Sequence, residues 1–112
     1  MVFVPPVQDW PHLIVMAQRS ETHAILIPSF NTGPKVLETV RGALENWAPV
    51  AVVVDGSTDG TDVELLKLAE SEPNLHIWVL SKNQGKGAAI LHGLRELGQL
   101  GFTHVLAMDA DG

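Results

Sequence analysis

The stretch V-A-V-V-V-D-G-S-T-D-G-T (50–61) decides the fold of this chain. Its first five residues are all apolar, and a short continuous apolar run is typical of a parallel strand that is covered on both faces. Glycines and small polar residues follow from Asp55 onward, which predicts a tight turn directly after the strand. Helical spacing starts at Thr61, so the stretch predicts a strand–loop–helix unit.

Three further apolar runs resemble the one at 50–54, namely A-I-L-I-P (24–28), L-H-I-W-V-L (75–80) and T-H-V-L-A-M (103–108). A segment with helical spacing separates each run from the next. The resulting order is β-α-β-α-β-α-β, and such alternation favours a parallel sheet with right-handed crossovers. We therefore predict an α/β fold with an open, mostly parallel, Rossmann-like sheet.

The three helical segments have recognisable limits. The first lies between two prolines, and its apolar face is predicted to comprise Leu37, Val40, Leu44 and Trp47. The second begins where Thr61 and Glu64 have the spacing of a capping box. The third is predicted to run from about Lys86 to Leu100.

Composition limits the class of protein. The chain has 112 residues, 46% of them hydrophobic and 18% charged, with a net charge of −6 and no cysteine. An acidic balance argues against a nucleic acid partner, and the lack of cysteine excludes thiolate metal sites. No apolar run approaches the roughly 20 residues of a membrane span. We expect a cytoplasmic protein, soluble or peripheral to a membrane, with an arm or short helix at 1–23 and one domain at 24–112.

Each predicted strand is followed by a polar or glycine-rich loop, and ligands of open α/β sheets bind beyond these strand ends. The loops are P-S-F-N-T-G (28–33), D-G-S-T-D-G-T (55–61), S-K-N-Q-G-K-G (81–87) and D-A-D-G (109–112). The side chains expected to converge on this one edge of the sheet are Asn31, Asp55, Asp59, Lys86, Asp109 and Asp111.

The chemistry of these loops suggests a site for a phosphorylated ligand and a metal. Asp109 and Asp111 could hold Mg²⁺ or Mn²⁺, which prefer oxygen ligands, although D-x-D-G also occurs in solvated turns. Asp55 could accept hydrogen bonds from a nucleobase or ribose, and Asp59 could instead cap the next helix. Lys86, at a glycine-rich helix start, suits a phosphate, with a flexible turn as the alternative.

Taken in order, I-P-S-F-N-T-G, V-V-V-D-G-S-T-D-G-T, N-Q-G-K-G-A-A-I-L-H-G-L and M-D-A-D-G resemble the N-terminal half of family 2 glycosyltransferases, and most of all the dolichyl- and polyprenyl-phosphate sugar transferases. The resemblance implies a GT-A fold that binds a nucleoside-diphosphate sugar. By this resemblance Pro28, Ser29 and Asn31 line the nucleotide pocket, and Asp55 contacts the base. Asp109 and Asp111 match the D-x-D motif that binds Mg²⁺ or Mn²⁺, and Lys86 faces the donor.

The sequence departs from the family pattern at three positions. Thr32 and Val54 stand where many members carry a carboxylate, and His92 replaces a common asparagine. The resemblance also implies that the acceptor, a polyprenyl phosphate, another lipid or a glycan, is bound beyond Gly112. The general base of an inverting transfer is expected there too, so no catalytic residue is assigned in this chain.

Two other functions fit parts of the same pattern. A phosphatase of the haloacid dehalogenase type would use D-A-D-G, with Asp109 as nucleophile and Asp111 as general acid. A non-catalytic or truncated nucleotide-sugar-binding module would keep the fold without the activity. The phosphatase does not require the D-G-S-T-D and N-Q-G-K-G loops, and such enzymes usually place their motif early in the chain, so the pattern favours it less than the glycosyltransferase.

Overall fold

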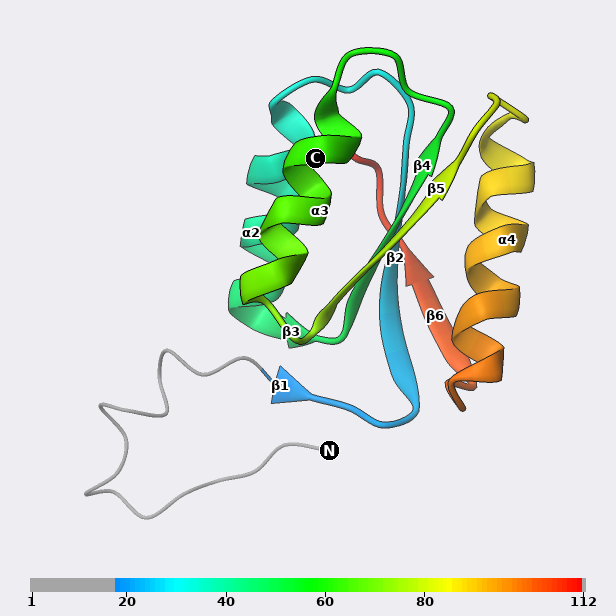
Figure 1. The fold of residues 1–112 in the computed structure, drawn as a ribbon. Helices are drawn as coiled ribbons and strands as arrows, with labels where there is room; N and C mark the ends of the chain where they lie inside the picture. The colour runs from blue at the N-terminus through cyan, green and yellow to red at the C-terminus, as the bar shows by residue number, and fades with distance from the viewer. Residues whose placement is uncertain (1–17, 112) are drawn as a thin grey trace.

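The computed structural model describes residues 18–111, and its centre is a four-stranded parallel sheet (Figure 1). The strand order is β5-β4-β2-β6. The strands are β2 (His23–Ser29), β4 (Val50–Asp55), β5 (Leu75–Leu80) and β6 (His104–Ala107). Each contains most of one predicted apolar run, so the predicted open parallel α/β sheet is confirmed.

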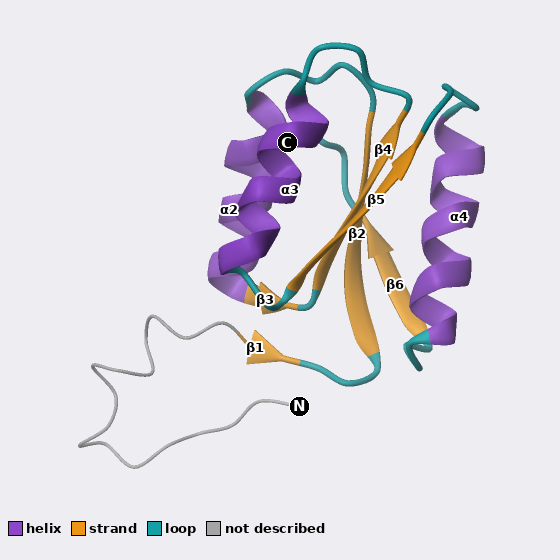
Figure 2. Cartoon of the chain, viewed as in Figure 1, coloured by secondary structure: helices purple, strands orange, loops and turns teal. Residues whose placement is uncertain are grey.

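Helices cover both faces of the sheet and complete three layers (Figure 2). Helices α2 (Lys35–Asn46) and α3 (Thr61–Ser71) lie on one face, and α4 (Lys86–Gln99) lies on the other. Helix α4 starts at the predicted residue, Lys86, and α3 starts at Thr61. This arrangement explains why the central strands carry no polar face.

The V-A-V-V-V run of β4 supplies side chains to both layers of the core. Val50, Val52 and Val54 pack under α2 and α3, whereas Ala51 and Val53 pack under α4. All five residues have no exposed surface. Successive side chains of a strand point to opposite faces, and burying each valine contributes roughly 1.5–3 kcal/mol. A strand between two helical layers therefore has to be apolar throughout.

Trp47 does not belong to the first helix, so that prediction was wrong. Helix α2 ends at Asn46, and Trp47 starts a short strand, β3 (Trp47–Ala48), that pairs in parallel with β1 (Gln18–Arg19). Its indole Nε1 donates to the carbonyl oxygen of His23 at 3.1 Å. A residue that precedes a proline favours the extended conformation, and Pro49 places Ala48 in that position.

The arm or short helix expected at 1–23 falls largely outside the described residues, which begin at Gln18. Within its described part, β1 is extended and is tied down by a side-chain hydrogen bond, in which Arg19 Nη2 donates to Asn74 Oδ1 at 2.8 Å. Among residues 18–111 no helix combines the length and the apolar character needed to cross a bilayer.

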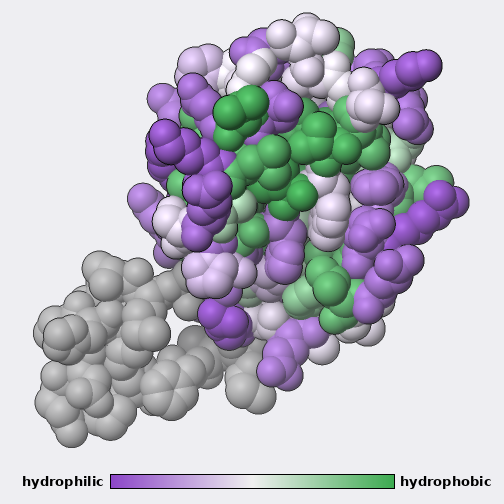
Figure 3. Space-filling view, in the orientation of Figure 1, coloured by the Kyte–Doolittle hydropathy of each residue, from purple (hydrophilic) through white to green (hydrophobic). Residues whose placement is uncertain are grey.

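The last strand is less buried than its apolar sequence predicted. β6 was expected to be covered on both faces, but it lies at an edge of the sheet, and Leu106 is 63% exposed. β5 occupies the other edge, and Figure 3 shows apolar side chains gathered over it between α3 and α4. The exposed large apolar residues of α3 and β5 are Val63, Leu66 and Val79. Only the two inner strands have the two-sided burial that a continuous apolar run predicts.

Candidate functional site

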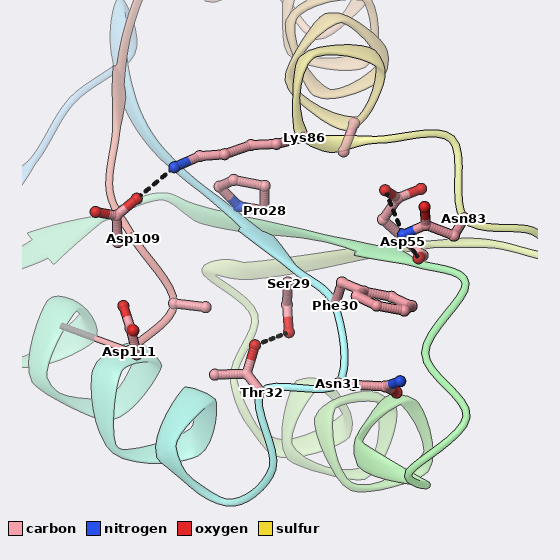
Figure 4. A pocket seen from close by; sticks show the side chains of 12 residues that line it. Pro28, Ser29, Phe30, Asn31, Thr32, Asp55, Asn83, Lys86, Asp109 and Asp111 are labelled. Atoms are coloured by element: carbon pink, nitrogen blue, oxygen red, sulfur yellow. Dashed lines mark hydrogen bonds and ion pairs between the residues drawn. The ribbon is translucent and has the colours of Figure 1, made fainter.

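A pocket of about 670 Å³ opens at the carboxyl ends of the strands, beside the point where the strand order reverses. From β2 the chain passes outward to β4 and β5 on one side, and it returns to β6 on the other. Open α/β sheets bind their ligands at such a switch point. The pocket is lined by residues of all four strand-end loops, including each of the seven predicted site residues: Pro28, Ser29, Asn31, Asp55, Lys86, Asp109 and Asp111 (Figure 4).

Asp55, at the end of β4, anchors the loop that precedes α4. Its carboxylate accepts hydrogen bonds from the backbone N–H groups of Gln84 and Gly85, both at 2.9 Å, and from Asn83 Nδ2 at 3.2 Å. The side chain is almost wholly buried, with 2% of the residue exposed. The acid therefore holds in place the loop from which Lys86 projects.

Asn31 joins the two loops on the other side of the pocket. Its Oδ1 accepts from the backbone N–H of Thr58 at 2.7 Å, and its own backbone N–H donates to Ser57 Oγ at 3.0 Å. Asn31 adopts a left-handed conformation with φ of 47°, which asparagine tolerates better than most residues. The D-G-S-T-D loop (55–59) is thus hydrogen-bonded both to the loop at 28–33 and, through Asp55, to the loop at 81–87.

Asp59 was predicted to converge with the other acids, but it does not line the pocket. Its Oδ1 accepts from the backbone N–H and the hydroxyl of Thr61 at 3.1 and 2.7 Å, and its Oδ2 accepts from Gly33 N at 3.0 Å. The predicted capping box of Thr61 and Glu64 was also wrong, because Thr61 is already the first helical residue and its hydroxyl serves Asp59. Gly60 holds the N-cap position of α3, and Asp59, one residue before it, supplies the oxygen that accepts from the first helical N–H.

The contacts of Asp59 predict an acid-sensitive contribution to stability. The hydrogen bond from the Thr61 hydroxyl, followed by backbone hydrogen bonds, lowers the pKa of this carboxyl. A lowered folded-state pKa gives stability that is present above the unfolded-state pKa and lost as the pH falls through the folded value. We expect Asp59→Asn to cost about 1 kcal/mol near neutral pH.

Urea unfolding of the wild type and of Asp59→Asn, followed from neutral pH to about pH 3, measures this effect. The difference between the two proteins should shrink toward zero at the acid end. Glu70→Gln, in the last turn of α3, is the matched control and should show no such convergence. A constant difference across the pH range would contradict the assignment of Asp59 as an ionised cap.

Lys86 and Asp109 form an ion pair across the mouth of the pocket. Lys86 reaches from the start of α4 to Asp109 Oδ1, with 2.6 Å between the atoms (Figure 4). The hydrogen bond and the opposite charge raise the pKa of Lys86 and lower that of Asp109. Both side chains are about two thirds exposed, at 64% and 66%, so solvent weakens the pair.

Asp109 and Asp111 have the right donor atoms for a hard divalent cation, since both present carboxylate oxygens to the same pocket. Within residues 18–111, no cluster of three or more His, Cys, Asp or Glu side chains forms a metal cage. Mg²⁺ is commonly held by one or two carboxylates, with substrate phosphates and water completing the coordination. The two acids therefore fit a metal that arrives with a phosphorylated ligand.

Five further residues line the pocket that the sequence did not single out as site residues, namely Phe30, Thr32, Asn83, Ala89 and Ala110. Phe30 is half exposed, so its ring offers an apolar face to a ligand. Thr32 Oγ1 lies 3.1 Å from Ser29 Oγ. All but Ala89 belong to the four loops, so counting every residue of these loops, and not the charged ones alone, would have identified them.

Comparison with known proteins places the chain in a family. Residues 24–112 match the family model described as "Glycosyl transferase family 2". The chain belongs to this family. It is 37% identical over 102 residues to the dolichyl-phosphate beta-glucosyltransferase ALG5D of Trichomonas vaginalis, an alignment that covers 80% of this chain and 30% of that protein.

A second relative is similar in sequence, and a solved structure is similar in fold. Identity to the polyprenol monophosphomannose synthase of Mycolicibacterium smegmatis is 33% over 92 residues, covering 79% of this chain and 34% of that protein. The structure of a mannosyltransferase from Pyrobaculum calidifontis in complex with GDP-Man and Mn²⁺ superposes with a TM-score of 0.61 and 24% identity, over 80% of this chain and 27% of that one. This likeness confirms the predicted GT-A fold.

The glycosyltransferase family 2 chain thus spans about a third of the length of these curated relatives, 30% and 34%. The family match also removes the support for a haloacid dehalogenase-type phosphatase, because it includes D-A-D-G together with the three earlier loops. The ligand that the pocket binds has to be inferred from the residues that line it.

Proposed function

We propose that residues 24–112 form the donor-binding part of a glycosyltransferase that takes its sugar from a nucleoside diphosphate. The observation that carries the proposal is the convergence of Asp55, Lys86, Asp109 and Asp111 on one pocket at the switch point of the sheet. Membership of glycosyltransferase family 2 supports the same reading.

Each wall of the pocket suits one part of such a donor. The half-exposed ring of Phe30 and the polar groups of Ser29 and Asn31 lie on the β2 side, where a nucleoside would be received. On the other side, Lys86 begins α4, and a helix start with a lysine favours phosphate. Asp109 and Asp111 would hold Mg²⁺ or Mn²⁺ beside the diphosphate, and the bound cation would neutralise charge on the departing nucleotide.

The acceptor is proposed to be a polyprenyl phosphate, which would bring the reaction to a membrane surface. The support comes from two relatives, a dolichyl-phosphate beta-glucosyltransferase and a polyprenol monophosphomannose synthase. Transfer with inversion requires a base that removes the acceptor proton as the acceptor attacks the anomeric carbon. We assign that base to no residue of 24–112.

Calorimetry with UDP- and GDP-sugars tests the donor site. We expect the chain to bind one of them only when Mn²⁺ is present. The double variant Asp109→Asn, Asp111→Asn should weaken metal-dependent binding on the order of tenfold or more, because removing even the hydrogen-bond partners of metal ligands commonly costs about 10- to 100-fold. The control is the double variant Glu45→Gln, Glu70→Gln. It also removes two negative charges, but from exposed acids that do not line the pocket.

The design separates a specific site from general charge. Equal weakening in both double variants would mean that overall charge, and not the D-x-D pair, governs the affinity. Binding that ignores Mn²⁺ altogether would contradict the metal assignment, and an absence of binding to every nucleotide sugar would contradict the proposed function.

A further inference from the structure

Lys86 forms an ion pair with Asp109, one of the two carboxylates that would bind a metal in this pocket. Its ammonium lies 2.6 Å from Asp109 Oδ1, and Asp111 adds a weaker charge attraction to the same lysine. The protein therefore already holds a cation at the D-x-D pair. No other His, Cys, Asp or Glu of the described residues joins the two acids to form a larger ligand group.

An ammonium and a divalent cation compete for the same oxygen. A metal that binds Asp109 has to break or share the ion pair with Lys86, and it then faces the repulsion of a nearby like charge. Without a third protein ligand, little in the site compensates for that cost. The free protein should consequently be a poor binder of the metal alone.

We propose that Lys86 makes metal binding conditional on the donor, an inference that rests on the proposed function. In the free protein, Lys86 holds Asp109. When a nucleoside diphosphate enters, its phosphate oxygens offer Lys86 another anionic partner, and Asp109 is released to the metal. Donor and metal thus bind with positive coupling, and each raises the affinity of the other by the same factor.

The structure provides what this exchange needs. Lys86 is 64% exposed at its side chain and begins α4, so the ammonium can move between the two partners without a change in the backbone. The loop behind it is held in place by the hydrogen bonds from Gln84 and Gly85 to Asp55. Only the flexible stem of the lysine has to change its conformation.

Metal binding without nucleotide is the direct test. Mn²⁺ is titrated into the 112-residue chain, and the free ion is followed by electron paramagnetic resonance. We expect Lys86→Gln to bind Mn²⁺ alone about three- to fivefold more tightly than the wild type, the size of effect that an exposed ion pair allows. Lys86→Arg keeps the charge and should remain close to the wild type.

Lys82→Gln is the matched control, because it removes the same charge from the same loop. Lys82 is exposed, and it takes no part in the ion pairs of residues 18–111. We expect its affinity for Mn²⁺ alone to equal that of the wild type. Equal tightening in both glutamine variants would overturn the inference, since general charge would then explain the result.

A second titration adds UDP or GDP. In the wild type the nucleotide should tighten Mn²⁺ binding on the order of tenfold, whereas Lys86→Gln should show a smaller gain. Nucleotide-dependent Mn²⁺ binding with no difference between Lys86→Gln and the wild type overturns only the role of Lys86. A failure of every variant to bind Mn²⁺, with or without nucleotide, overturns the proposed function as well.

Discussion

Replacing Gly56 with alanine should destabilise the protein by about 2–5 kcal/mol. Gly56 follows Asp55 with φ of 71°, a left-handed conformation that costs other residues about 1–2 kcal/mol. A Cβ atom at this position would lie 2.5 Å from the carbonyl carbon of Lys82 and closer still to the backbone nitrogen of Asn83. Backbone atoms cannot rotate away, so the whole loop at 81–85 would have to move.

Gly60→Ala is the matched control, because it separates the strain of the conformation from the clash. Gly60 has φ of 83°, yet a Cβ atom there would meet nothing within 4 Å. This variant should lose only about 1–2 kcal/mol. Urea unfolding followed by circular dichroism gives both values, against a total of about 5–15 kcal/mol for a typical domain.

The difference between the two glycine variants also reports on the pocket. If Gly56→Ala loses no more than Gly60→Ala, the close approach between the two loops does not exist in solution. If it unfolds the chain outright while Gly60→Ala folds, the result supports the close approach, because the conformational strain is common to both variants.

The sheet and its helices could be predicted because their signals are local. The V-A-V-V-V run needs two apolar layers around it, and that requirement alone selects a parallel sheet covered by helices. Lys86 follows a glycine-rich turn, and α4 starts there as predicted. The prediction that Trp47 belongs to the first helix was wrong because Trp47 pairs with Gln18 in a short sheet. That contact joins distant parts of the chain, and helical spacing does not encode it.

The convergence of the site residues on one pocket was equally predictable, since the loops after parallel strands all lie at the same edge of the sheet. The hydrogen-bond partners of each polar side chain at that edge were harder to predict. Asp59 faces Gly33 and Thr61 instead of the pocket, and Asn31 bonds the loop at Ser57 and Thr58. The bonds of Asn31 to Ser57 and Thr58, and of Gly33 to Asp59, join residues 26 or 27 apart, so they follow from the packed structure and not from the loop sequences. The bond between Asp59 and Thr61 is local, and helix capping by Asp59 was one of the two alternatives that the sequence offered.

Asp55 was expected from the sequence to contact a ligand, but its hydrogen bonds to the loop at 81–87 also contribute to the stability of the protein. Asp55→Ala should cost about 2–4 kcal/mol, because hydrogen bonds to a charged group are each worth about 1.5–3 kcal/mol and solvent would replace part of the loss. Asn83→Ala removes only the side-chain donor, and its cost should be about 1 kcal/mol. Asp55→Asn keeps one acceptor oxygen and should fall between the two.

Amide hydrogen exchange locates the effect. The backbone N–H groups of Gln84 and Gly85 should lose protection in Asp55→Ala and keep it in Asn83→Ala, since they bond to the carboxylate and not to Asn83. If Asp55→Ala costs no more than Asn83→Ala and leaves both amides protected, the carboxylate does not anchor the loop. It would then be free for a nucleobase, and the wall that presents Lys86 would need another support.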